Sequence, residues 1–307
     1  MKKSRFPALF VAVTLLVTLF LPMSAYAVEE PVLTCRNAIL IDATYDEVLY
    51  DKGAYEKVYP ASITKVMTAL LVLEAVDAGQ LTLDTPITAT AEALEVPEDS
   101  SVAGIQVGDT YTVEQFLYCL LLPSGNEVAQ ILAITVDGSI EAFVEHMNRR
   151  AEELGCQGTH FVNPHGYHDD NHYTTAYDIT RFMKAAMEYD LFQTILTSPN
   201  YTLPANGVSE ERIIRNTNAL TSNYRYPGYL YGPGTGGKTG TTVEAGNCLV
   251  ETAREGDMYL ISVILGAEEV ELDNGDVDRR QFSETIKLLD WGFDNFQRVT
   301  LSPDETL

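Results

Sequence analysis

The chain has 307 residues, of which 46% are hydrophobic, and it carries 44 acidic against 20 basic side chains, a net charge of −24. So acidic a surface repels nucleic acid and other polyanions at long range. We therefore expect no nucleic-acid partner, and any anionic group of a substrate must meet a local cluster of Lys or Arg. The length allows one large or two small domains with a sizeable core, so there is room for an enzyme.

Residues 1–27 are typical of a secretory signal peptide. They run from a charged start through an apolar stretch to a small-x-small end: Lys2, Lys3 and Arg5, then 7–23, then Ala25-Tyr26-Ala27. The apolar stretch falls short of the roughly 20 residues that cross a bilayer, which favours cleavage after Ala27 over a permanent span. We expect an exported, extracytoplasmic protein, secreted or at the cell surface, which contacts the membrane only if this segment stays uncleaved.

Strand-forming and helix-forming patterns follow in blocks. Two β-rich runs around a polar turn at 43–47 predict a hairpin over 37–52. The middle of the chain has apolar residues at helical spacing. This pattern predicts helices over 63–76, 112–122, 127–136, 140–154 and 175–189.

After about Tyr201 the pattern returns to strands. Apolar runs over 246–253 and 258–266 flank a turn and predict a second hairpin, and a one-sided apolar pattern predicts a closing helix over 281–293. Strands at both chain ends around a helical middle predict an α/β fold. We expect one antiparallel sheet built from both ends of the chain, with the helical block inserted.

The cysteines and histidines show no disulfide framework and no metal motif. The four cysteines could pair outside the cytoplasm in three ways, but they lack CxxC spacing, and Cys119 lies in an apolar run typical of a core. The histidines between residues 160 and 172 lack the spacing of a metal motif. We expect no metal, and we expect His165 and His172 to hold their loop in shape.

Ser62 and Lys65 are the first residues that suggest chemistry. They stand three residues apart at the start of a predicted helix, so their side chains lie on one face. A serine hydroxyl is a poor nucleophile until a base takes its proton, and a lysine amine is a base only when neutral. Lowering a lysine pKa from about 10.4 to near 7 takes roughly 4 kcal/mol, which burial and a second nearby cation could supply. Alone, the pair is more often a capped helix start with a solvated lysine.

Two further tripeptides change this balance. Ser124-Gly125-Asn126 lies between two predicted helices, and Lys238-Thr239-Gly240 follows the glycine-rich residues 232–237 and leads into the final strands. A capped helix–helix loop and a turn into a strand would explain each one by itself. In the order Ser-x-x-Lys, Ser-Gly-Asn and Lys-Thr-Gly, they resemble the motif set of penicillin-binding proteins and serine β-lactamases.

The resemblance is sharpest around the nucleophile. Residues 59–69, Tyr-Pro-Ala-Ser-Ile-Thr-Lys-Val-Met-Thr-Ala, resemble the nucleophile segment of the low-molecular-mass penicillin-binding proteins, the serine D-Ala-D-Ala carboxypeptidases of peptidase family S11. Residues 161–166 and 172–178 resemble that family's signature between its second and third motifs. The likeness implies a β-lactamase/transpeptidase-like fold, a catalytic domain over 28–296, a polar tail over 297–307 and no cofactor.

The resemblance also implies an activity and roles. The family removes the terminal D-alanine from peptidoglycan stem peptides that end in D-Ala-D-Ala, and β-lactam antibiotics inhibit it covalently. Ser62 would attack the carbonyl between the two D-alanines, and Lys65 would accept its proton. The other implied roles are Lys238 as the second cation, Ser124 as proton relay to the leaving amine, Asn126 at the substrate amide, Thr239 and Gly240 in the strand that binds the substrate carboxylate, and the backbone N–H groups of Ser62 and Thr241 as oxyanion hole.

One family feature does not map cleanly. The family usually has an arginine about ten residues before an aromatic-Gly-Phe, where it helps to bind the terminal carboxylate. Counting back from Trp291 leads to Gln281, with Arg280 just before it. We expect a one-residue bulge to bring Arg280 into the site; otherwise the carboxylate relies on Thr239 and Lys238.

Rival functions stay open. A serine β-lactamase would share the fold, but the Glu-x-x-Leu-Asn segment with which class A enzymes activate water does not occur in this sequence. A peptidoglycan transpeptidase or endopeptidase would use the same acyl-enzyme. A non-catalytic penicillin-binding sensor would keep the fold, although all three motifs are intact. The sequence ends soon after Gly292-Phe293, so we expect the extra β-domain and membrane-binding helix of many relatives to be absent.

Overall fold

The computed structural model describes residues 28–299. The predicted signal peptide over 1–27 and the end of the predicted tail, from residue 300 on, lie outside the described residues. Val28–Glu30 belong to a separate N-terminal unit, and everything below concerns the compact unit that begins at Pro31. Within residues 28–299, no helical segment has the length and hydrophobicity that a membrane crossing requires.

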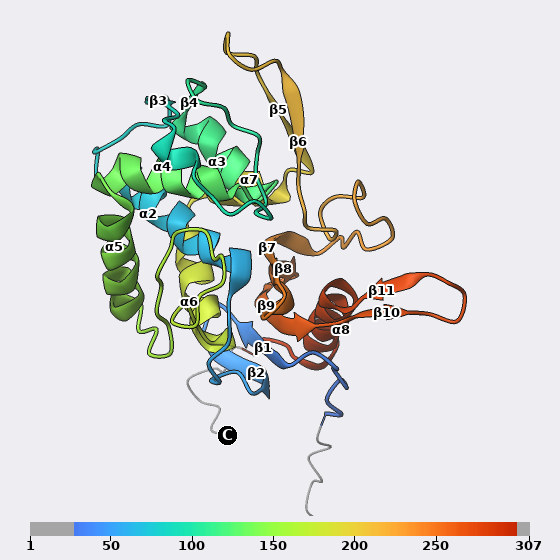
Figure 1. Ribbon diagram of the computed structural model, residues 1–307. Helices are drawn as coiled ribbons and strands as arrows, with labels where there is room; N and C mark the ends of the chain where they lie inside the picture. The colour runs from blue at the N-terminus through green and yellow to red at the C-terminus, as the bar shows by residue number, and fades with distance from the viewer. Residues whose placement is uncertain (1–27, 300–307) are drawn as a thin grey trace, which may run out of the picture. The chain divides into compact units, whose positions relative to one another are not determined.

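A five-stranded antiparallel sheet runs through this unit in the order β2-β1-β9-β8-β7 (Figure 1). Its strands come from both chain ends, as predicted, and β1 pairs with β9 so that Ile39 stands opposite Val263. β1 and β9 are buried almost throughout, because helices pack on both faces of the sheet. The bounds are β1 (Asn37–Asp42), β2 (Glu47–Lys52), β7 (Gly234–Thr242), β8 (Gly246–Glu255) and β9 (Met258–Ala267).

A helical block is inserted between β2 and β7, and all five predicted helices form close to their predicted bounds. The short α7 and the single turn η2 were not predicted. The block consists of η1 (Ala61–Thr64), α2 (Lys65–Asp77), η2 (Glu92–Leu94), α3 (Val113–Leu121), α4 (Asn126–Asp137), α5 (Ile140–Glu153), α6 (Ala176–Ala186) and α7 (Asp190–Thr197).

Three small antiparallel hairpins and a last helix complete the described chain. The hairpins are β3 (Pro86–Thr88) with β4 (Thr110–Thr112), β5 (Asn200–Leu203) with β6 (Arg212–Arg215), and β10 (Glu269–Glu271) with β11 (Val277–Arg279). The last helix is α8 (Arg280–Asn295), where the sequence predicts a helix over 281–293.

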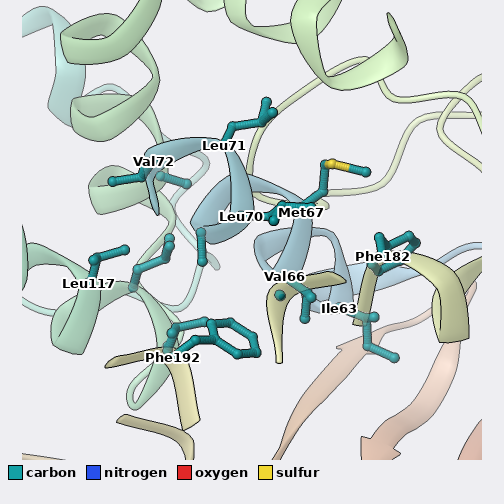
Figure 2. Packing of buried hydrophobic residues seen from close by; sticks show 14 of the residues in the cluster. Ile63, Val66, Met67, Leu70, Leu71, Val72, Leu117, Phe182 and Phe192 are labelled. Atoms are coloured by element: carbon teal, nitrogen blue, oxygen red, sulfur yellow. The ribbon is translucent and has the colours of Figure 1, made fainter. Parts of the chain in front are cut away.

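Helix α2 lies in the interior of the helical block (Figure 2). All its residues from Lys65 to Leu73 are buried, which is expected of a helix that is surrounded by other elements. Leu117 of α3, Phe182 of α6 and Phe192 of α7 belong to the same core cluster around it (Figure 2). Because each such side chain contributes about 1.5–3 kcal/mol when fully buried, the position of α2 is firmly set.

The side chains of the sheet alternate between two cores. Ile39 and Ile41 of β1 belong to the cluster formed with the helical block, whereas Leu40 packs with Leu288 of α8 on the other face. Gly292 lets α8 approach closely, because a Cβ there would lie 2.6 Å from Leu40 Cδ2. The helical block and α8 therefore cover opposite faces of the sheet.

The Lys-Thr-Gly motif lies inside a strand rather than ahead of one, which corrects the prediction. β7 runs over 234–242, contains the motif and pairs with β8, with Gly240 opposite Cys248. A run so rich in glycine has little strand propensity of its own and carries no periodic signal. Tertiary contacts therefore make it a strand.

The four cysteines are buried and unpaired in the part of the chain that the structure describes. Cys119 packs into the core from α3, as predicted.

Candidate active site

Ser62 and Lys65 meet at the start of α2. Ser62 lies on the turn η1, Lys65 begins α2, and Lys65 Nζ lies 3.0 Å from Ser62 Oγ. Ala61, just before the serine, has the left-handed φ of 48°, which is uncommon outside glycine. Gly166 packs so tightly on it that a Cβ would lie 1.8 Å from Ala61 O. The backbone that carries the serine is thus fixed on more than one side.

Lys65 is fully buried, and its surroundings favour the neutral amine. Nζ donates to Asn126 Oδ1 at 2.7 Å and to the carbonyl oxygen of His165 at 2.8 Å. Burial lowers the pKa of Lys65 well below its usual value, and the charge of Lys238 lowers it further. A neutral amine has two N–H groups, which these two oxygens accept, and one lone pair, which remains for the hydroxyl of Ser62. This is the arrangement of a general base beside its nucleophile.

Ser124 and Lys238 form a second pair next to the first. Ser124, at φ 67°, lies in the loop between α3 and α4, and its Oγ is 3.0 Å from Lys238 Nζ. Lys238 also donates to the carbonyl oxygen of Thr239 at 3.0 Å, and burial lowers its pKa to about 7. Among the described residues its hydrogen-bond partners are a hydroxyl and a carbonyl, with no carboxylate. In an acidic protein, this is a cation that an anionic group of a substrate could approach.

Gly240 joins β7 to the nucleophile turn. A Cβ on Gly240 would lie 3.0 Å from both Pro60 O and Ser62 N, so any larger residue would push the two segments apart. A cavity of about 430 Å³ opens beside the contact, with Ser62, Asn126 and Thr241 among its lining residues. The serine therefore faces a space of the size that holds a small ligand or the end of a peptide.

Glu127 is a site residue that the sequence analysis did not identify. It is buried at the start of α4, and its Oε1 accepts from the backbone N–H groups of Ala103 and Gly104 at 2.7 and 3.1 Å. The neighbouring Asn126 donates its backbone N–H to Ser101 O at 2.8 Å. These bonds tie the loop before α3 to the site. A charged residue inside an otherwise apolar helix was the available signal.

A second group that the sequence analysis missed lies behind Thr239. Thr239 Oγ1 is 2.6 Å from Thr217 Oγ1, on a turn between β6 and β7. The next residue of that turn, Asn218, donates from Nδ2 to Glu251 Oε2 of β8 at 2.7 Å. Single polar residues between two hairpins carry no distinctive spacing, so only the folded structure reveals this connection.

His165 and His172 hold their loop, as predicted. His172 Nε2 lies 2.8 Å from Thr64 Oγ1, and its Nδ1 accepts from Val162 N at 3.1 Å. His165 Nδ1 accepts from Tyr167 N at 3.1 Å. Burial lowers the pKa of both histidines to about 3, so they are neutral. No group of His, Cys, Asp and Glu that could hold a metal ion occurs in residues 28–299.

Arg280 does not join the site in this structure, in contrast to the expectation. Its guanidinium donates to Thr34 Oγ1 at 2.7 Å and lies 3.9 Å from Asp278 Oδ2, and it does not line the cavity. Helix α8 runs without interruption from Arg280, and Gln281 is buried. The other predicted site residues come together around the cavity and the two lysines: Ser62, Lys65, Ser124, Asn126, Lys238, Thr239, Gly240 and Thr241.

Known proteins share this fold. Among solved structures, the chain is similar to the DD-transpeptidase of Streptomyces K15, with a TM-score of 0.76 and 29% identity over 87% of this chain and 100% of that one. It is also similar to penicillin-binding protein D2 of Listeria monocytogenes in its ampicillin-bound form, with a TM-score of 0.72 and 28% identity over 86% of this chain and 99% of that one.

The sequence comparisons agree with the structural ones. The chain is 32% identical to the D-alanyl-D-alanine carboxypeptidase DacF of Bacillus subtilis over 85% of its own length and 63% of DacF. It spans less than two thirds of the length of the first curated relatives that it matches. The peptidase S11 family, described as D-alanyl-D-alanine carboxypeptidase, matches residues 24–269. With most of its length inside that match, this chain belongs to peptidase family S11, the D-alanyl-D-alanine carboxypeptidases.

Proposed function

We propose that this protein is an exported serine carboxypeptidase that removes the terminal D-alanine from peptidoglycan stem pentapeptides through an acyl-enzyme at Ser62. The observation that carries the proposal is the buried Lys65 amine, 3.0 Å from Ser62 Oγ, with its two N–H groups already donated to oxygens. The same activity is named for DacF and for the family.

Acylation begins at the Ser62 hydroxyl. Its proton passes to Lys65 Nζ as Oγ bonds to the carbonyl carbon between the two D-alanines. The backbone N–H groups of Ser62 and Thr241 face the resulting oxyanion, and fixed donors of this kind are worth about 10²–10³ in rate. The C–N bond then breaks, and the leaving nitrogen takes a proton from Ser124. Lys65 returns its proton to Ser124 beside the charge of Lys238, so Lys65 is neutral again.

Substrate orientation comes from β7 and α4. Lys238 and Thr239 meet the terminal carboxylate, since Lys238 has no carboxylate partner among the residues of the described unit. Asn126 binds the amide on the other side of the scissile bond. Water then attacks the ester carbonyl as Lys65 takes one of its protons, and Lys65 passes that proton to Ser62 Oγ as the ester bond breaks. The shortened peptide leaves as a carboxylic acid, which loses its proton to solvent and becomes a carboxylate.

The proposal extends to inhibitors and location. A β-lactam amide would acylate the same Oγ, and the similar Listeria protein has been solved in an ampicillin-bound form. Peptidoglycan lies outside the cytoplasm, so we place the protein there, exported through the predicted signal peptide over 1–27.

Labelling with a fluorescent penicillin tests the nucleophile. The wild-type protein is incubated with the probe and separated on a denaturing gel, with Ser62→Ala as the matched control. We expect a covalent band for wild type and none for the variant. An unlabelled wild type, or a labelled Ser62→Ala, would remove the acyl-enzyme.

Release of D-alanine from a stem pentapeptide tests the reaction. A transpeptidase is the second candidate, because the similar K15 enzyme bears that name. Adding an amine acceptor such as glycine separates the two: a carboxypeptidase mainly releases D-alanine and the tetrapeptide, whereas a transpeptidase mainly forms the acceptor adduct. Rapid hydrolysis of penicillin instead of a stable label would indicate a β-lactamase.

A further inference from the structure

Glu251 is a fully buried carboxyl group that the reaction above does not use. It lies on β8, its exposed fraction is 0%, and burial raises its pKa to about 8. Its Oε2 accepts from Asn218 Nδ2 at 2.7 Å and its Oε1 from Gly236 N at 3.2 Å. A buried carboxyl is costly unless its hydrogen bonds are made. Here those bonds connect β7 with the turn over 216–221.

The glycines at the start of β7 make room for this carboxyl. At Gly237, which stands opposite Glu251 in the sheet, a Cβ would lie 2.3 Å from Glu251 Oε2, and at Gly234 it would lie 3.2 Å from Oε1. The pairing with β8 shifts between Gly234 and Gly236, and Glu251 takes the N–H of Gly236 at that irregularity. Thr252 donates to the carbonyl oxygen of the same glycine at 2.8 Å. Side chains of β8 thus hold β7 at the point where the regular pairing of the two strands is interrupted.

The turn over 216–221 carries Thr217 to the hydroxyl of Thr239. Asn216 and Asn218 on either side are buried, and Asn216 Nδ2 donates to two carbonyl oxygens at the end of α7, each at 3.1 Å. Between them, Thr217 Oγ1 lies 2.6 Å from Thr239 Oγ1. The place of Thr217 is therefore set by three contacts: its own backbone N–H donates to Leu122 O at 3.1 Å, Asn216 is held on one side, and Asn218 is bonded to Glu251 on the other.

We propose that Glu251 is a positioning residue: it holds the Thr217 turn and β7 at the spacing that aligns the Thr217–Thr239 hydroxyl pair with the substrate carboxylate. The inference rests on the proposed function of the site. Two hydroxyls 2.6 Å apart share one hydrogen between them, so the second hydrogen is left to donate to a carboxylate. Without Glu251, Gly236 N loses this acceptor, Asn218 Nδ2 keeps only the longer contact of 3.5 Å to Thr221 Oγ1, and one of the ties between the turn and the strand is lost.

A double-mutant cycle on the full chain tests this connection, with the rate of acylation by a fluorescent penicillin as readout. Because penicillin carries the corresponding carboxylate, we expect Glu251→Ala and Thr217→Val each to slow acylation about tenfold, the worth of one hydrogen bond. The double variant should be no slower than the slower single one, since both act through one contact. Multiplied effects, or a wild-type rate for Glu251→Ala, would overturn the proposal.

Two further variants keep the test sharp. Glu251→Gln keeps the side-chain volume and one acceptor oxygen, and it replaces Glu251→Ala if that variant folds poorly. It should slow acylation less than Glu251→Ala does, and it should have no further effect when Thr217 is already replaced by Val. Ser262→Ala is the matched control, because Ser262 stands opposite Glu251 on β9 and its buried Oγ has no hydrogen-bond partner within residues 28–299. It should acylate at the wild-type rate. Failure of the proposed function would look different: wild type would not be labelled, or Ser62→Ala would be.

Discussion

The two sides of the site are built in different ways. Ser62 and Lys65 lie at the start of one helix, where the i to i+3 spacing by itself brings their side chains together, and α2 is buried on every side. Lys238 and Thr239 lie on β7, an edge strand with glycine at four of its nine positions. Local geometry therefore sets the nucleophile and its base, whereas tertiary contacts set the side that binds the carboxylate.

This difference affects how substitutions should act. A change on the helical side removes a chemical group that nothing else replaces. A change on β7 shifts the strand by a fraction of an ångström and should lower the rate of acylation only in part. Misplacement of about 1 Å costs roughly 10²-fold, so a smaller shift should cost less. The following experiments compare the two sides.

Exchanging each lysine for arginine should give the largest contrast. An arginine remains charged and cannot take the proton of Ser62, so Lys65→Arg should slow acylation by at least about 10³-fold. Lys238→Arg keeps the positive charge opposite the substrate carboxylate and should lose only about tenfold, from the poorer fit of the larger group. Rates of penicillin labelling, with thermal melts to confirm folding, measure both. Equal losses would mean that both lysines act as cations, and the assigned base would be wrong.

Gly240→Ala should disturb the contact between the two sides. The new Cβ would meet Pro60 O and Ser62 N at 3.0 Å, so β7 must move away from the nucleophile turn. We expect acylation to fall by about 10–100-fold with the melting temperature little changed. Gly232→Ala is the control in the same stretch, because nothing lies within 4 Å of a Cβ there. If both variants behaved alike, the close approach of β7 would be unimportant for the reaction.

Glu251 gives the β7 side a pH dependence of stability of its own. Its pKa is raised from 4.5 to about 8 by burial, so the folded protein keeps a proton that the unfolded chain has lost. Stability from this group is fully present below pH 4.5 and is lost as the pH rises toward 8. Between pH 6 and 8 wild type should lose about 2 kcal/mol relative to Glu251→Gln, whose amide does not titrate. Urea unfolding of both proteins across this range measures the difference, and parallel curves would show that Glu251 is ionised in the folded state.

The sequence predicted the parts of the molecule that depend on local pattern. The five main helices and the strands β8 and β9 follow from apolar periodicity, and Ser62, Lys65 and Ser124 follow from motif spacing. Helix α7 was missed because Asp190–Thr197 is only eight residues long and contains β-branched residues with weak helix propensity.

What could not be predicted depends on residues far apart in the chain. Glu251 interrupts an apolar run inside a predicted strand, and its contact with Asn218 of the 216–221 turn forms only in the fold. Thr217 has no motif of its own and meets Thr239 only after that turn has packed. The sequence shows that residues 232–237 are rich in glycine, but the space that Gly234 and Gly237 leave for a carboxyl on the next strand is visible only in three dimensions.

Arg280→Gln should have the smallest effect, because Arg280 does not line the cavity. The guanidinium donates to Thr34 Oγ1, which in turn donates to Glu284 Oε1 at 2.6 Å, so it anchors the segment before β1 rather than the cavity. Partly exposed contacts of this kind are worth under about 1 kcal/mol, and acylation should stay within about twofold of wild type. A tenfold or larger loss in labelling rate without a change in melting temperature would place Arg280 at the substrate carboxylate. In that case the carboxylate side would extend from β7 to the start of α8.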